Sequence, residues 1–288
     1  MAERNQRGLA GKRTTPPRAW LILVVLLLFS VSAPLNQFKV PPILPLLMDA
    51  LGLSMGRAGL LMSVFAVTDL LLALPSGFIL QRVGSRITGL LAGGSIVVGA
   101  ALGALSPSIG LLLASRVIEG IGTSFMAVLA PAIIARWFAR DDRGTAMGIW
   151  AAWVPVGTAA MLILAPSVGG AWGWRAVWWL GAGYALAATG VYLLGVGTGR
   201  SAGTKVPEAR SAPAVGVGEV LRNRDIWLLA AAFGAFNAAV IGASTYLPTF
   251  LTEERGLTLA QASLLSSVPT LITIFSAPGG GLVSDRVG

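Results

Sequence analysis

The sequence predicts an all-α membrane protein that crosses the bilayer about eight times. Of its 288 residues, 55% are hydrophobic and only 11% are charged, whereas a soluble domain carries roughly 25% charged residues. The apolar residues form long continuous runs, unlike the short alternating strands of a membrane β-barrel. About 20 apolar residues are enough to cross the hydrocarbon core as a helix. A soluble fold is therefore excluded.

The first apolar run, 19–47, follows a polar and basic tail, 1–18, and is interrupted by Pro34, Pro41 and Pro42. Short breaks rich in Gly, Ser, Pro and Asp separate the later runs. These runs are 58–80, 87–105, 109–136, 144–168, 175–197, 226–250 and 258–283. The segment 198–224 is longer, rich in Gly, Ala, Ser and Pro, and basic, which is typical of a linker. We therefore expect a cytoplasmic tail (1–18), a six-helix bundle (19–197), a cytoplasmic linker (198–224) and two helices of a second, incomplete bundle (225–288).

The positive charge of the chain indicates its topology. Sixteen of the 21 Lys and Arg residues fall in segments that lie on one side if the helices alternate, and three fall on the other. Cytoplasmic loops carry such an excess. We expect a multi-pass protein of the plasma membrane, the inner membrane in a bacterium, with a cytoplasmic N-terminus. The net charge of +9 therefore indicates membrane topology and not nucleic-acid binding.

The residue inventory narrows the chemistry. The chain contains no His and no Cys, which excludes thiol nucleophiles, His-dependent dyads and metal ligation through imidazole or thiolate. No ATP-binding loop of the G-x-x-x-x-G-K-[ST] type is present. We expect no enzyme, no cofactor and no metal site, with the lipid bilayer and a small-molecule substrate as partners. The oligomeric state is not defined by the sequence; we expect a monomer.

A repeat relates the two predicted bundles. Gly77, Arg82, Val83 and Gly84 at the end of the second run align with Gly281, Arg286, Val287 and Gly288 at the end of the eighth, at one offset of 204 residues. Parallel repeats joined by a linker are found in transporters built from two six-helix halves.

These residues resemble the major facilitator superfamily. The segment from Gly77 to Arg86 is similar to the family's loop motif G-x-x-x-D-R-x-G-R, and Gly281 to Gly288 is similar to its second copy. Arg116 to Gly122 resembles the fourth-helix motif R-x-x-x-G-x-G. The resemblance implies twelve helices and a cytoplasmic latch formed by the loop motifs. The latch positions are Gly77, Gln81, Arg82, Gly84, Arg86, Gly281, Asp285, Arg286 and Gly288.

Two departures from the family pattern stand out. Gln81 occupies the acidic position that the second copy keeps as Asp285, which predicts a weaker latch in the first half; alternatively, Gln81 accepts the same hydrogen bonds as a neutral group. The repeat also predicts that about 115 residues and four helices would follow Gly288 in a complete pair of bundles.

Four ionisable residues fall inside apolar runs, where a charge costs a few kcal/mol and is a functional candidate. In one interpretation, Lys39 and Arg116 bind an anionic substrate, while Asp69 or Glu119 carries a coupled proton. In the other, Arg116 neutralises Glu119 and Asp69, and Lys39 extends toward the membrane surface. Arg116 and Glu119 are three residues apart, so they share a helix face.

Further candidates line the same expected cavity. Asn36 precedes Lys39 in the Pro-interrupted run, Trp153 lies in the fifth run and Asn237 in the seventh. By contrast, the cluster of Trp172, Trp174, Trp178 and Trp179 is typical of an aromatic belt at the membrane surface.

The sequence therefore predicts a secondary active transporter of a small solute, preferably an anion, working by alternating access and coupled to protons. The alternative from another class is a non-transporting membrane sensor or an inert truncated product.

Overall fold

The computed structural model describes residues 15–196 and 222–287; for residue 275 and residues 277–287 only the backbone is described. Within these ranges, all regular secondary structure is helical. The elements are α1 (Pro17–Gln37), η2 (Pro41–Ile43), α2 (Leu44–Leu51), α3 (Met55–Ala104), α4 (Ile109–Trp137), η3 (Arg140–Asp142), α5 (Arg143–Ala151), α6 (Trp153–Trp172), α7 (Trp174–Gly195), α9 (Arg224–Glu253) and α10 (Leu259–Val287).

Every predicted apolar run is helical, but the boundaries differ in three places. The first run is divided into α1, η2 and α2, because Pro41 and Pro42 cannot continue the hydrogen-bond ladder of α1. The second and third runs together form α3. The fifth run is divided between α5 and α6 at Ala152.

Gly84 divides α3 into two membrane-length helices. Its φ of 78° and ψ of 172° are non-helical, and this region of backbone space is essentially restricted to glycine. The chain therefore turns inside the 50-residue element, at the loop position that the sequence predicts.

Six helical segments of the described chain are long and apolar enough to cross a membrane, and α3 is one of them. The helix α10 is not among these six, because its apolar stretch, Leu259–Ile274, is shorter. With α3 providing two crossings and α10 one more, the eight predicted crossings are accounted for.

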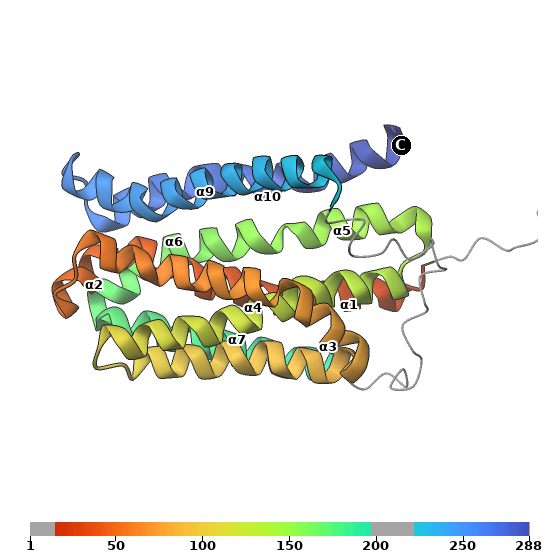
Figure 1. Ribbon diagram of the computed structural model, residues 1–288, viewed down its shortest axis with the longest axis horizontal. Helices are drawn as coiled ribbons and strands as arrows, with labels where there is room; N and C mark the ends of the chain where they lie inside the picture. The colour runs from red at the N-terminus through yellow and green to blue at the C-terminus, as the bar shows by residue number, and fades with distance from the viewer. Residues whose placement is uncertain (1–14, 197–221, 288) are drawn as a thin grey trace, which may run out of the picture.

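The helices α1 to α7 lie side by side with their long axes roughly parallel, and α9 and α10 form a pair along one side of them (Figure 1). In this pair α10 contacts α5 and α6, and α9 contacts η2. Buried apolar side chains form two core clusters, one centred on the first half of α1 and one around η2, α2 and the end of α1. Most of α9 is exposed, and its buried residues are Thr245, Pro248 and Thr249 near its end.

The helix ends follow local sequence signals. Ser54 begins α3 by accepting a hydrogen bond from the backbone N–H of Arg57 (3.5 Å), and Asn223 begins α9 by accepting from Asp225 (2.9 Å). Gly52, in the left-handed conformation at φ 59°, ends α2. Ser, Asn and Gly are favoured at these positions.

The predicted division into a tail, two bundles and a linker stays a prediction. Residues 1–14 of the tail and 197–221, which hold most of the linker, lie outside the described ranges.

Candidate functional site

Lys39 lies in the break of the first membrane segment, between the end of α1 and η2. Its side chain is completely buried. The ammonium donates to Asn36 Oδ1 (3.0 Å) and pairs with Glu119 of α4. It also lies 4.6 Å from the ring centroid of Trp178 in α7, a favourable cation–π position. Three helices therefore contribute to the surroundings of one ammonium group.

Arg116 of α4 has an acceptor for each of its five guanidinium N–H groups. The acceptors are the carbonyl oxygens of Asn36 (2.7 Å), Gln37 (2.8 Å) and Leu61 (3.1 Å), Glu119 Oε2 (2.6 Å) and the sulfur of Met62 (3.9 Å). The last carbonyls of a helix have no partner within the helix, and a cation is favoured at that end. Arg116 thus caps the end of α1 inside the protein.

Lys39, Arg116 and Glu119 form one network, and all three side chains are 0% exposed. One carboxylate bridges two cations, so the network carries one net positive charge when all three groups are ionised. The Arg116–Glu119 pair is the one expected from their spacing. Lys39 does not extend toward the membrane surface, because Glu119 holds it in the interior.

Glycines make room for the network. A Cβ on Gly99 of α3 would lie 2.7 Å from Glu119 Cγ, and a Cβ on Gly181 of α7 would overlap Asn36 Oδ1. Gly103 similarly admits the indole of Trp178. Gly99 and Gly103 are four residues apart and so share one face of α3, which is the signal in the sequence that could have revealed this contact.

The expectation of an aromatic belt is wrong for two of the four tryptophans. Trp172 and Trp179 are exposed, 75% and 49%, as a belt requires, but Trp174 and Trp178 are 5% and 0% exposed. The Nε1–H of Trp178 is buried without an acceptor among the described residues. Trp178 therefore belongs to the surroundings of Lys39.

Asp69 is separate from this network. It is half-buried in α3 and accepts a hydrogen bond from the hydroxyl of Ser124 in α4 (2.7 Å). No basic side chain in the described ranges pairs with it. The interpretation in which Arg116 neutralises Asp69 is therefore wrong.

Trp153 and Asn237 lie apart from the charged groups. Trp153 is half-buried and stacks on Trp150, with ring centroids 5.3 Å apart, and Trp150 donates to Ser30 of α1 (3.0 Å). The amide of Asn237 donates to the carbonyl of Phe233 in its own helix (3.0 Å). Neither residue forms a hydrogen bond with the Lys39 network.

The loop-motif residues are divided between described and undescribed parts of the chain. Gln81, Arg82 and Arg86 are exposed around the turn at Gly84, and their side chains make no hydrogen bond within the described ranges; Gly77 is half-buried in α3. The second copy falls in the part of α10 for which only the backbone is described, which contains Gly281, Asp285 and Arg286. Gly288 lies outside the described residues.

The helical bundle and its buried charges define a polytopic membrane protein with an ionic network in its interior. The family model of the Major Facilitator Superfamily matches residues 20–288. The chain belongs to this family.

Similar proteins include a hexuronate transporter of Bacillus subtilis, 23% identical over 273 residues, with 92% of this chain and 64% of the relative covered. The cyanate transport protein CynX of Escherichia coli is 28% identical over 265 residues, covering 91% and 65%. A nitrite extrusion protein of Bacillus subtilis is 26% identical over 239 residues, covering 82% and 58%. The chain thus spans about two thirds or less of the length of these relatives.

The fold is similar to that of a bacterial homologue of the human lysosomal transporter Spinster, in an inward-facing and unoccupied conformation. The TM-score is 0.76 at 19% identity, with 94% of this chain and 63% of that chain covered.

Proposed function

We propose that this protein is a secondary active transporter of a small anion, driven by a proton gradient and working by alternating access. Membership of the family and the anion-transporter names of several relatives support this proposal. The charges of the buried Lys39–Glu119–Arg116 network also support it.

The single observation that carries the anion assignment is the net positive charge of the Lys39–Glu119–Arg116 network. An uncompensated charge in the membrane interior is costly, and a bound anion neutralises it. All N–H groups of Arg116 are already used. Lys39 has oxygen acceptors for two of its three ammonium hydrogens. We therefore assign substrate contact to Lys39 and a positioning role to Arg116.

The test is uptake into proteoliposomes. Wild type is assayed with labelled glucuronate, nitrite, cyanate and sulfoacetate, and with glucose and choline as neutral and cationic controls. We expect transport of at least one anion and of neither control. Lys39→Gln should lower its uptake at least tenfold, which corresponds to about 1.4 kcal/mol, whereas Arg57→Gln, which alters an exposed arginine, should leave it unchanged. Equal uptake by wild type and Lys39→Gln would overturn the substrate contact.

We assign the coupled proton to Asp69 and not to Glu119, because Glu119 is paired with two cations. A carboxylic acid inside a membrane is less costly when neutral than when charged, and Asp69 has a neutral partner in Ser124 that tolerates both states. Asp69→Asn should abolish uphill uptake driven by a pH gradient but preserve downhill exchange. Unchanged uphill uptake would assign the proton elsewhere.

We also propose a cytoplasmic N-terminus in the bacterial inner membrane, on the basis of the Lys and Arg distribution. Because the sequence contains no Cys, a single introduced cysteine can be labelled without background from native thiols. Ser108→Cys should react with an impermeant maleimide in intact cells, and Arg140→Cys only after permeabilisation. The reverse pattern would contradict this orientation.

A further inference from the structure

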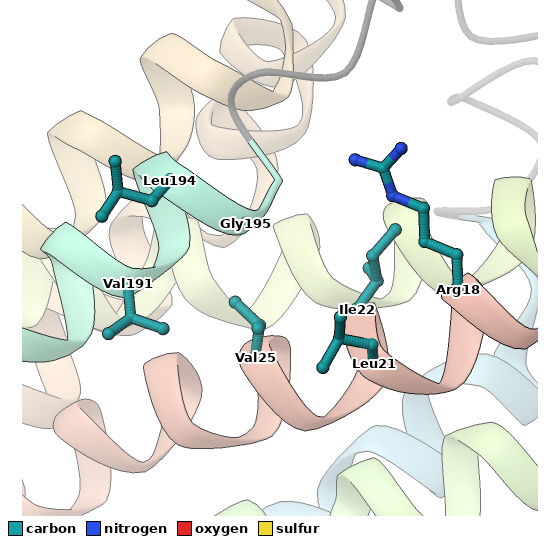
Figure 2. A pocket seen from close by; sticks show the side chains of 7 residues that line it. All are labelled: Arg18, Leu21, Ile22, Val25, Val191, Leu194 and Gly195. Atoms are coloured by element: carbon teal, nitrogen blue, oxygen red, sulfur yellow. The ribbon is translucent and has the colours of Figure 1, made fainter.

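A groove lies between α1 and α7, near the N-terminal end of α1 and the C-terminal end of α7. Its volume is about 400 Å³. Figure 2 shows the two helices running side by side, with apolar side chains from both and Arg18 extending at one end. The lining residues are Arg18, Leu21, Ile22, Val25, Val191, Leu194 and Gly195.

The groove opens to the outside of the helical bundle. Its rim residues Leu21, Val191 and Leu194 are 65%, 45% and 75% exposed, whereas Ile22 beneath them is 2% exposed. At Gly195, a Cβ would lie 3.3 Å from Val25, so the missing side chain keeps the two helices close. An apolar surface on the outside of a membrane bundle contacts acyl chains.

Arg18 gives the groove a polar end. It is exposed and is the second residue of α1, so it lies at the edge of the membrane segment. Within the described ranges its guanidinium has no acidic partner, and its ring neighbour, Trp137, lies 6.0 Å away. Among the described residues, none of those that line the groove is acidic. The site is therefore complementary to a negative group attached to an apolar chain.

The dimensions fit the upper part of one lipid tail. Val25 lies seven positions after Arg18, a length of about 10 Å along a helix and about one third of a 30 Å hydrocarbon core. Most of the chain's Lys and Arg residues share the predicted side of Arg18, and anionic lipids accumulate next to such residues.

We propose that the α1–α7 groove is a binding site for an anionic phospholipid, with an acyl chain between the helices and the phosphate on Arg18. The proposal is independent of the transported substrate. A basic residue near the membrane surface favours an anionic lipid by about 1 kcal/mol, which is about a fivefold preference over a zwitterionic lipid.

The test measures lipid retained by the purified 288-residue protein, by native mass spectrometry, during titration with dioleoylphosphatidylglycerol or dioleoylphosphatidylcholine. We expect about a fivefold preference for phosphatidylglycerol in the wild type. Arg18→Gln should remove the preference, whereas Arg140→Gln, which alters an exposed arginine that does not line the groove, should keep it.

A second variant tests the apolar part of the groove. Val191→Trp alters an exposed rim position and fills the groove, so it should lower retention of both lipids while the melting temperature is unchanged. Persistent preference in Arg18→Gln, or wild-type retention in Val191→Trp, would overturn the proposal. Displacement of bound lipid by soluble glycerol phosphate would also overturn it, because the site would then bind only a headgroup.

Discussion

Replacing Glu119 by Gln should destabilise the protein more than any other neutral, isosteric change in its interior. The substitution conserves size, so it creates no cavity, but it removes the counter-charge of both Lys39 and Arg116. Breaking one buried ion pair costs about 3–5 kcal/mol. Since this carboxylate serves two fully buried cations, we expect about 5 kcal/mol of unfolding free energy to be lost.

A double-mutant cycle isolates the electrostatic part. Lys39→Gln combined with Glu119→Gln removes one charge of each sign and leaves Arg116 with its backbone acceptors. We expect the double variant to be about 2 kcal/mol more stable than the sum of the two single effects, within the range for residues in one network. Unfolding is followed by circular dichroism during SDS titration in mixed micelles.

The network is refuted as a stabilising unit if the two effects add within about 0.5 kcal/mol, which is the behaviour of independent sites. A loss of less than about 1 kcal/mol of unfolding free energy in Glu119→Gln would also contradict a stabilising network. Two buried cations without a counter-charge should cost more than that.

Three further predictions use matched controls. Gly181→Ala should cost about 1–3 kcal/mol in the same unfolding assay because the new methyl overlaps a buried amide, while Gly183→Ala on the same helix meets open space and should cost nothing measurable. Gly84→Ala should cost about 1–3 kcal/mol for its positive φ, and an equal effect of the helical control Gly94→Ala would rule out backbone strain as the cause. Gln81→Asp should restore the acidic latch position and hold the cytoplasmic side shut, so that a cysteine introduced on that side is labelled more slowly. Unchanged transport and unchanged labelling would refute the latch.

The number and type of elements could be predicted because length and composition alone identify membrane helices. The break around Lys39 was also predictable, since consecutive prolines remove two backbone donors. The pairing of Arg116 with Glu119 required only the spacing of one helix.

The surroundings of Lys39 could not be predicted in the same way. These helices are apolar on nearly every side, so no polar stripe indicates which face meets which neighbour. The position of Trp178 in the sequence predicts a place at the membrane surface, and only the rotation of α7 about its axis brings the indole against Lys39. The partner of Asp69 was missed for the same reason, because Ser124 is one of many small polar residues able to lie opposite it.

The cap that Arg116 places on α1 joins residues 80 positions apart in the chain. During synthesis, the carbonyls at the end of α1 therefore enter the membrane before their donor exists. The first membrane segment is completed only when α4 has been made and inserted, so its final conformation depends on a helix that the ribosome produces three crossings later.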